Sequence, residues 1–413
     1  MPPSSGIERI CFSMKKKKLL FVISTLTGGG AERALCNLSL ALEDRADVDI
    51  LINNKSPEDY PHGGRVITLG IPFKKHMSLA YQIKALFKRI KVLKKLKEEG
   101  GYDACISFMD SANYTNVLAD MGRKKSRCKT IVSIRVTLSE CRSWKYRYLV
   151  RPMARIFYPH AGTIVTVSKE SGKDLVDHYG IKKKNLRVIY NGNDLDRIRR
   201  LSEKECPVEL EDDKFYFFNL GRMTISKGQW HLIRAFKEVV KVHPRARLLI
   251  CGDGEYREYL ESLIKGLSLE DHVILAGFHN NPYAIMRRCQ VFVSASVFEG
   301  FSNALVEGLA VGMPVLSTDF PSSAREILAP DTPFEKKQTE GIEEAKGGIL
   351  IPVCSGVHYK AEDPLEKQEE ILGKAMIRLI EDDELRMRYA GGAKAHSALF
   401  SMESMSEKWL SMV

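Results

Sequence analysis

The chain has 413 residues, a length at which about two to three domains are expected, and its 44% hydrophobic content is typical of a folded globular protein. Lys and Arg total 63 against 52 Asp and Glu, but residues 1–200 hold 38 basic and 19 acidic residues and residues 201–413 hold 25 and 33. This split between a basic and a mildly acidic half, together with the lack of a nucleic-acid-binding motif, argues against nucleic acid as a partner.

Nine cysteines are scattered without a Cys-x-x-Cys spacing, which argues against a disulfide framework and a structural zinc site and is typical of a reducing compartment. No apolar run approaches the roughly 20 residues of a membrane helix. Lys15–Lys18 and the apolar run Leu19–Ser24 resemble the start of a signal peptide, but the run is too short and no cleavage pattern follows. We expect a cytoplasmic protein with residues 1–14 as an N-terminal extension.

Short apolar runs alternate with helical patterns along the whole chain. The strands expected in the first half are 19–24, 48–52, 65–69, 104–108, 130–134, 162–167 and 186–190. Helical patterns in that half include 31–42, 79–97, 143–157 and 169–178. The strands expected in the second half are 215–220, 246–251, 272–276, 290–294, 314–318 and 348–351. Continuous apolar strands separated by amphipathic helices predict parallel sheets covered on both faces.

The two halves predict two doubly wound, Rossmann-like α/β domains that face each other across a cleft. We place the first domain at 15–200 and the second at 201–390, because the polar stretch 197–213 separates the two sets of strands. The remaining segment 391–413 has a helical pattern. Ligands of such sheets bind at the carboxyl ends of the strands, so the site is expected between the domains.

Three glycines, Gly28, Gly29 and Gly30, lie between the first strand and the first helix. Glycines permit close approach of the backbone, and a helix N-terminus offers free N–H groups to an anion. The spacing is not Gly-x-Gly-x-x-Gly, and no acidic residue closes the next strand, which disfavours a nicotinamide dinucleotide. From this loop alone, an anion site and a simple tight turn are equally consistent.

The second domain opens with Gly221 at a strand end, followed by Arg222 and, five residues later, Lys227. A planar guanidinium and a mobile ammonium at a strand end suit the oxygens of a phosphate group. The plainer alternative is a pair of solvated surface cations. Another glycine turn, at Gly252, follows the next strand.

The most specific segment runs from Ser296 to Glu307. Glu299 stands at a strand end, and Glu307 is expected about two turns into the following helix. Two carboxylates so placed suit the hydroxyl groups of one ligand, while the backbone amides of Phe301 and Ser302 suit its phosphates. The alternative makes Glu307 an ordinary surface residue of the helix, but the small residues that follow it predict a closely packed helix.

These motifs together resemble the retaining glycosyltransferases of the GT-B class, family 4 (glycosyltransferase group 1). The resemblance extends from residue 19 to about residue 390. The matching pieces are Gly28–Arg33, Val188–Gly192, Gly221–Gly228, Gly252–Gly254 and the Glu299–Glu307 pair.

The resemblance implies a role for each part of the donor site. Arg222 and Lys227 would hold the donor diphosphate, Glu307 the ribose hydroxyls and Glu299 the hydroxyls of the donor sugar. It also implies that the last helix, within 391–413, can cross back onto the first domain. The full set of expected donor-binding residues is Gly28, Gly29, Gly30, Gly221, Arg222, Lys227, Gly252, Glu299, Gly300, Phe301, Ser302 and Glu307, with Arg222, Lys227 and Glu299 as the catalytic candidates.

Within this family, the segments Thr318–Leu328 and Gly348–Pro352 are similar to a branch that extends surface polysaccharides and lipid-linked glycans, some members of which transfer N-acetylhexosamines. Many family members carry a His in the segment that is Ser133–Thr137 here, and the similar branch often has Ser-x-Arg-Asn. Arg135 matches that pattern and Val136 departs from it, so no general base is visible. Arg135 and Asp110 are the acceptor-side candidates.

Residues 74–97 contain nine Lys and Arg and no acid, with apolar residues at helical spacing. Basic amphipathic helices bind anionic membrane surfaces, and the basic aromatic stretch 142–158 suits the same interface. The alternative is that the apolar stripe faces only the core of the protein and the cations face water.

We therefore expect an enzyme that moves a hexose or N-acetylhexosamine from a nucleotide sugar, with UDP as the expected nucleotide, to a hydroxyl of a lipid-linked or polysaccharide acceptor at the cytoplasmic membrane face. The nucleotide sugar is a co-substrate and no other cofactor is expected. No metal is expected either, because no Asp-x-Asp pattern stands within the matching motifs. Two alternatives stay open: a nucleotide-sugar epimerase of the same fold, and a non-catalytic scaffold on the membrane surface.

Overall fold

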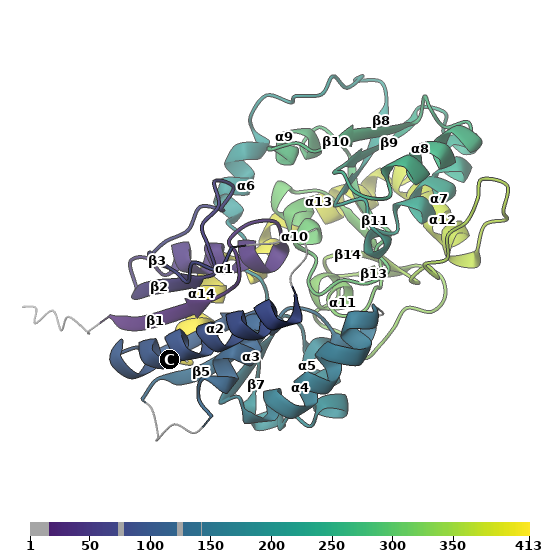
Figure 1. Cartoon of the computed structure of the whole chain (residues 1–413). Helices are drawn as coiled ribbons and strands as arrows, with labels where there is room; N and C mark the ends of the chain where they lie inside the picture. Colours follow the sequence, from purple (N-terminus) through teal and green to yellow (C-terminus); the bar gives the residue numbers. More distant parts are fainter. Residues whose placement is uncertain (1–15, 73–77, 122–126, 142) are drawn as a thin grey trace, which may run out of the picture.

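The computed structural model describes residues 16–72, 78–121, 127–141 and 143–413. It contains two α/β units, each built on a sheet of seven strands (Figure 1). Of the predicted segments, the extension 1–14, residues 74–77 of the basic stretch and Arg142 lie outside the described residues. The sheets and their helices confirm the prediction of two doubly wound domains.

The first sheet is all parallel, in the order β3-β2-β1-β4-β5-β6-β7. Its strands are β1 (Lys17–Val22), β2 (Ala46–Ile52), β3 (Arg65–Thr68), β4 (Ala104–Phe108), β5 (Lys129–Ile134), β6 (Thr163–Thr166) and β7 (Leu186–Val188). Its helices are α1 (Gly30–Ala41), α2 (Leu79–Glu99), α3 (Asp110–Leu118), α4 (Arg151–Phe157) and α5 (Lys169–Tyr179). The helix predicted over 143–157 is present from residue 144 onwards, and it contains a π-helical turn, Tyr146–Val150, that continues directly into α4.

The second sheet has the order β10-β9-β8-β11-β12-β14-β13. Its strands are β8 (Phe215–Leu220), β9 (Ala246–Cys251), β10 (Val273–Gly277), β11 (Val291–Ser294), β12 (Val315–Thr318), β13 (Glu343–Ala345) and β14 (Gly348–Ile351). Its helices are α6 (Leu195–Ser202), α7 (Gln229–Val242), α8 (Arg257–Gly266), α9 (Pro282–Met286), α10 (Asn303–Val311), α11 (Ala324–Leu328), α12 (Lys367–Glu381) and α13 (Asp383–Ser397). Helix α6 packs on α9 and α10, so the second unit includes residues from position 195 onwards.

Alternate residues of the strands pack on opposite faces of each sheet. Leu20 and Phe21 belong to different buried clusters, and so do Phe217 and Phe218. These strand residues are therefore buried on both faces of each sheet. Because neither face meets water, the strands are continuously apolar.

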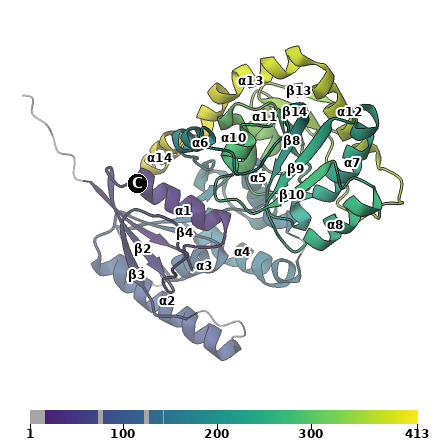
Figure 2. The same ribbon diagram turned by 90° about the horizontal axis from the view of Figure 1, so that it is seen from above.

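The last helix, α14 (Met402–Leu410), lies against α1 of the first domain (Figure 2). The Trp409 ring packs on Phe108, with the ring centres 5.8 Å apart. The chain thus passes between the domains twice, and the two passages meet where Asn193 pairs with Ser401. None of the helices in the described part of the chain combines the length and the apolar character needed to span a bilayer.

Edge strand β13 was not predicted, and it runs antiparallel to β14. Its three residues are Glu-Glu-Ala, which carry no β-strand pattern. The strand is held by a charge: Arg325, 2% exposed, has Nη2 2.9 Å from Glu343 Oε2 and 2.7 Å from Asp319 Oδ2. Lys336 Nζ lies 2.9 Å from the other oxygen of Glu343.

This ion-pair network predicts an acid-dependent loss of stability. The Arg325 guanidinium lowers the pKa of Glu343 from 4.5 to about 2, against an opposing effect of burial. The contribution of ionised Glu343 to the free energy of unfolding is therefore fully present above the pKa that this carboxyl has in the unfolded chain. It is lost as the pH falls towards 2, and it amounts to about 1–2 kcal/mol after screening by solvent. Urea unfolding at pH 6 and pH 3 should show a smaller drop in the free energy of unfolding for Glu343→Gln than for wild type. Equal drops would contradict this assignment.

Candidate functional site

The loop after β11 presents an oriented carboxylate. Glu299 Oε2 accepts a hydrogen bond from Lys227 Nζ at 2.8 Å, and Oε1 accepts from Ser296 Oγ at 2.7 Å and Ser302 Oγ at 3.1 Å. The Lys227 and Glu299 side chains are only 19% and 11% exposed. Because β8 and β11 are neighbours in the sheet, the loops that carry Lys227 and Glu299 leave the same edge. The structure thus brings together two of the three catalytic candidates.

The third candidate, Arg222, is exposed on the loop after β8 and interacts electrostatically with Glu32 of α1. That loop packs tightly against the turn after β9. A Cβ atom on Gly252 would lie 2.0 Å from the carbonyl oxygen of Gly221, and φ of Gly252 is 137°, so only glycine fits there. The predicted glycines Gly221 and Gly252 therefore set the path of the backbone that carries Arg222.

Glu307 is buried, with 7% of its surface exposed, and its Oε1 accepts a hydrogen bond from Tyr283 Oη at 2.9 Å. Burial raises the pKa of this carboxyl, while nearby Arg33 opposes that shift. The expected depth in the helix was wrong: α10 begins at Asn303, so Glu307 is its fifth residue, one turn in rather than two. The helix starts late because the chain stays extended through Ser302, where it holds Glu299.

The glycine loop of the first domain leads straight into α1, with Gly28 at a φ of 90° and Gly29 as the N-cap. The Glu32 carboxylate covers Gly29, since a Cβ atom there would lie 2.3 Å from Glu32 Oε2. Burial raises the pKa of Glu32. The acidic Glu32 side chain thus lies over the N-terminus of α1, where the Gly28–Gly30 backbone was expected to approach a phosphate.

The loop 295–302 between β11 and α10, which carries Glu299, is called the donor-side loop below. Of the acceptor-side candidates, Arg135 lies beside this loop. Its guanidinium packs on the Phe108 ring and donates hydrogen bonds to Asn191 Oδ1 and, at 3.3 Å, to Ser133 Oγ. Asn191 in turn donates to Asn303 Oδ1 at 3.1 Å, across the domains. The sequence pointed to Arg135, but not to its contact with Asn191 or to the link from Asn191 to Asn303.

Asp110 is placed differently. It is the first residue of α3, and its carboxylate accepts a hydrogen bond from Tyr158 Oη at 2.9 Å. Burial raises the pKa of Asp110, and hydrogen bonding by Tyr146 opposes the shift. These tyrosines belong to the first domain, so the contacts of Asp110 do not connect it to the Lys227–Glu299 pair.

At Gly300 the donor-side loop packs against the backbone of the first domain. A Cβ atom on it would lie 2.0 Å from the carbonyl oxygen of Arg135. Gly300→Ala should therefore force the domains apart and lower kcat about 100-fold, because misplacement by about 1 Å costs that much. Gly391→Ala is the control, since a Cβ there meets nothing within 4 Å. Steady-state kinetics that leave Gly300→Ala near wild type would contradict the close contact.

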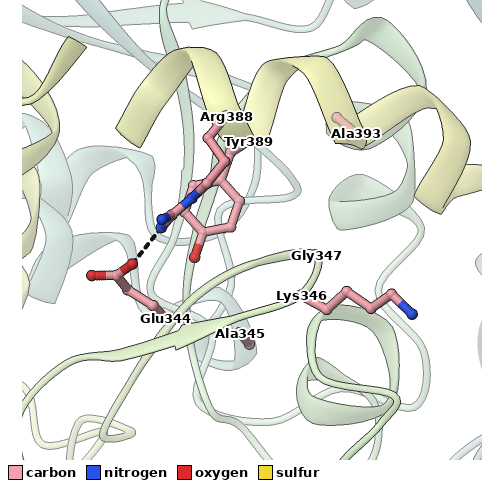
Figure 3. Close-up of a pocket in the computed structure, with 8 residues that line it drawn as sticks. Glu344, Ala345, Lys346, Gly347, Arg388, Tyr389 and Ala393 are labelled. Carbon is pink, nitrogen blue, oxygen red and sulfur yellow. Dashed lines mark hydrogen bonds and ion pairs between the residues drawn. The ribbon is translucent and has the colours of Figure 1, made fainter. Parts of the chain in front are cut away.

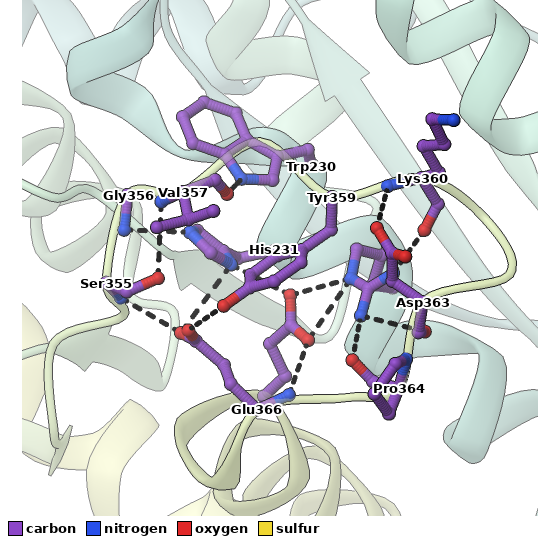
Figure 4. A network of polar contacts seen from close by, with 12 residues as sticks. Trp230, His231, Ser355, Gly356, Val357, Tyr359, Lys360, Asp363, Pro364 and Glu366 are labelled. Atoms are coloured by element: carbon purple, nitrogen blue, oxygen red, sulfur yellow. Dashed lines mark hydrogen bonds and ion pairs between the residues drawn. The ribbon is translucent and has the colours of Figure 1, made fainter.

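A polar network in the second domain joins α7 to the segment 355–366 and to α12 (Figure 4). Gly356 N donates to His231 Nε2 at 3.2 Å, so Nδ1 carries the proton and donates to Glu369 Oε1 at 2.8 Å. His231, Cys354 and Glu366 bring three metal-ligand atoms within 4.8 Å of one another. Both ring nitrogens of His231 already have partners, so this cluster is satisfied as a hydrogen-bonded clip between α7 and α12.

A cavity of about 380 Å³ lies elsewhere, between the β13–β14 turn and α13 (Figure 3). It is lined by Glu344, Ala345, Lys346, Gly347, Arg388, Tyr389, Gly392 and Ala393. Glu344, its acidic residue, is paired with Arg388 and Arg378. None of the predicted donor residues lines this cavity, and it is not the candidate site.

Comparisons with known proteins agree with the geometry. Residues 202–344 match the family Glycosyl transferases group 1, and residues 28–197 match Glycosyltransferase Family 4. An uncharacterized glycosyltransferase of Methanocaldococcus jannaschii is 30% identical over 79% of this chain and 82% of its own length. The N-acetylgalactosamine-N,N'-diacetylbacillosaminyl-diphospho-undecaprenol 4-alpha-N-acetylgalactosaminyltransferase of Campylobacter jejuni is 31% identical over 93% of this chain and 96% of its own.

Solved structures share the fold at low sequence identity. The crystal structure of HepE from Anabaena in complex with UDP-glucose superimposes with a TM-score of 0.69 at 20% identity, over 96% of this chain and 100% of that one. The sucrose-phosphate synthase of Thermosynechococcus elongatus gives a TM-score of 0.73 at 16% identity, over 96% and 98%. With this fold and these relatives, the chain belongs to glycosyltransferase family 4 (group 1), the retaining hexosyltransferases of GT-B fold that use nucleotide sugars.

Proposed function

We propose that this enzyme moves a hexose or N-acetylhexosamine from a UDP-sugar to a hydroxyl of a lipid-linked or polysaccharide acceptor at the cytoplasmic face of the membrane. The observation that carries the proposal is the Glu299 carboxylate, oriented by three hydrogen bonds beside Lys227. The C. jejuni relative, whose name gives an undecaprenol-linked acceptor, supports the acceptor class. The fold neighbour that binds UDP-glucose makes UDP the first nucleotide to test.

Each donor contact follows from the charge and placement of a side chain. Lys227 and Arg222 neutralise the diphosphate, and Glu307 accepts hydrogen bonds from the ribose hydroxyls. Glu299 accepts from the sugar hydroxyls with the lone pairs that Lys227 and the two serines leave free. The glycine loop Gly28–Gly30 approaches the phosphates from the first domain once the Glu32 side chain moves aside.

The reaction then needs no protein base. The acceptor oxygen forms its bond to C1 of the sugar on the face from which the diphosphate leaves, and the acceptor proton passes to a diphosphate oxygen. Negative charge grows on the leaving group, where Lys227 and Arg222 lie, so these cations stabilise the transition state more than the ground state. Their two charges do for the diphosphate what a divalent cation does in metal-dependent transferases, so we propose that no metal is required.

Thermal unfolding in the presence of nucleotides tests the donor assignment. A ligand of the native state raises its stability by RT ln(1 + [L]/Kd), about 2.7 kcal/mol at 100 times Kd. We expect UDP to raise the unfolding temperature more than GDP or ADP, and one UDP-sugar to raise it further. A shift with none of them would refute the donor site.

Membrane association is the second part of the proposal, and it rests on exposed apolar and basic side chains of the first domain. Helix α2 lies on the side of that domain away from the second (Figure 2). It buries Ala85 and Leu93 against the core but leaves Phe87 67% exposed. Farther along the chain, Trp144 just before the π turn and Ile156 of α4 are also exposed, at 75% and 60%. Exposed aromatic groups flanked by cations suit the surface of an anionic bilayer.

Four lysines of α2 are exposed, whereas Lys97 is buried against Asp120 at 2.8 Å and faces inward. The exposed ones are Lys84, Lys88, Lys91 and Lys95. Replacing these four by Gln should weaken cosedimentation with phosphatidylglycerol vesicles at least about tenfold, at about 1 kcal/mol per cation. The control replaces four exposed lysines of the second domain, Lys241, Lys265, Lys346 and Lys360. Equal losses in both variants would rule out α2 as the binding element.

A further inference from the structure

A carboxylate from the second domain caps a helix of the first. Glu326, on α11, accepts hydrogen bonds from the backbone N–H groups of Lys169 at 2.9 Å and Glu170 at 3.2 Å. The third free amide of α5, that of Ser171, donates to the N-cap Ser168 Oγ at 3.0 Å. A helix N-terminus carries unpaired donors and partial positive charge, so a carboxylate there is strongly favoured. Two of the three first amides of α5 are thus satisfied only while the domains are in contact.

The same carboxylate is tied to the point where the chain crosses between the domains. Tyr190 Oη donates to Glu326 Oε2 at 2.8 Å. The Tyr190 ring stacks on Phe301 of the donor-side loop, with ring centres 5.8 Å apart, and contacts Phe400 just before α14. Glu326 is 5% exposed, so this contact lies inside the interface and not at its rim.

Ser322, four residues before Glu326, has a φ of 90°, a conformation that persists in a non-glycine residue only where the surroundings fix it. Here the first domain fixes it. Ser322 N donates to Glu170 Oε2 at 2.6 Å, and Ser322 Oγ lies 2.8 Å from Ser168 Oγ and 3.1 Å from Ser171 Oγ. Lys337 Nζ, 2.8 Å from Glu170 Oε2, adds an ion pair.

Ser322 and Ser323 also hold the backbone of the donor-side loop within the second domain. Ser322 Oγ donates to the carbonyl oxygen of Gly300 at 2.6 Å, and Ser323 Oγ accepts from Ser302 N at 3.1 Å. Gly300 directly follows Glu299, and Ser302, three residues after Glu299, is one of its three hydrogen-bond partners. One short segment therefore touches α5 with one set of atoms and the Glu299 loop with another.

We infer that residues 322–326 couple contact between the domains to the shape of the Glu299 loop, with Glu326 and Ser322 as positioning residues for transfer. When the domains separate, Ser322 loses the partners that fix its φ, and Gly300 loses its hydrogen bond. The Glu299 carboxylate is then in place for the sugar only when the domains enclose it, which limits attack by water on the donor. This inference rests on the proposed transferase function.

The test compares Glu326→Gln with wild type. Gln has the same size and keeps one acceptor oxygen, but its NH2 group would face the other α5 N–H group as a second donor, so one of the two cap hydrogen bonds is lost. We expect kcat to fall about 10–100-fold, the ratio of donor hydrolysis to transfer to rise, and the Kd of UDP measured by calorimetry to stay within about twofold. Asp382→Asn is the matched control, because Asp382 caps α13 (Leu385 N to Oδ1, 2.8 Å) without leaving the second domain.

A second variant guards against misfolding of the first. Ser322→Gly relieves the φ of 90° and removes the short CH2OH side chain, so it folds more easily but no longer holds Gly300. It should show the same loss of kcat with unchanged UDP affinity. Normal kcat in Ser322→Gly, or in a folded Glu326→Gln, overturns the coupling while the function stands. Failure of wild type to bind UDP refutes the function itself.

Discussion

Lys227→Ala should lower kcat by about 10²–10³-fold and lower the unfolding temperature by only a few degrees. The loss of rate follows from the charge that grows on the leaving diphosphate, which the ammonium neutralises in the proposed mechanism. The loss of stability is small because Glu299 keeps its two serine partners, at 2.7 and 3.1 Å, after the lysine is removed. Steady-state kinetics and thermal unfolding on the same preparation measure both effects.

Lys241→Ala is the control for this experiment, since Lys241 is an exposed residue of α7 whose carboxylate partner, Glu238, is also exposed. It should leave kcat and the unfolding temperature unchanged. A large loss of stability in Lys227→Ala would show that the Lys227–Glu299 pair is structural, and an unchanged kcat would remove Lys227 from the mechanism.

Glu307→Ala should raise the Kd of UDP by about 10–100-fold, because hydrogen bonds to a charged acceptor contribute about 1.5–3 kcal/mol each. The variant should be folded, since Glu307 is a buried carboxylate whose desolvation already raises its pKa. Glu307→Gln keeps one acceptor oxygen and should fall between Glu307→Ala and wild type. Calorimetric titration with UDP measures all three proteins.

Tyr283→Phe separates the carboxylate from its support. It removes only the hydroxyl group that donates to Glu307 Oε1 at 2.9 Å, so UDP affinity should fall less than in Glu307→Ala. If Glu307→Ala bound UDP as wild type does, Glu307 would be a buried structural residue and the ribose would lie elsewhere.

Much of the fold could be predicted because both faces of each sheet are covered. Strand β8 is Phe-Tyr-Phe-Phe-Asn-Leu, a continuous apolar run that identifies a buried parallel strand. Strand β13 has no such pattern. It is an edge strand of three residues, and the Glu343–Arg325 ion pair, rather than apolar burial, stabilises it. The turn at Tyr146–Val150 was equally hidden, because π-helical and α-helical turns show similar apolar spacing.

The candidate site likewise contains residues that the sequence predicts and partners that it does not. Glu299, Glu307 and Lys227 were predicted because glycines and strand ends nearby mark where a ligand reaches the backbone. Some of the partners that orient them, such as Tyr283 of α9, come from other elements and carry no local signal. Glu326 is the extreme case: it lies 157 residues from Lys169 in sequence, and only the packing of the two domains brings its carboxylate to α5.

The product of a single reaction tests the central claim most directly. The protein is incubated in turn with UDP-N-acetylgalactosamine, UDP-N-acetylglucosamine, UDP-galactose and UDP-glucose, and with a short polyprenyl-diphosphate-linked N-acetylgalactosamine as acceptor. One donor is expected to yield an extended lipid-linked glycan whose new linkage, determined by NMR, keeps the α configuration of the donor. A β linkage, an epimerised nucleotide sugar without transfer, or no turnover of any donor would contradict it.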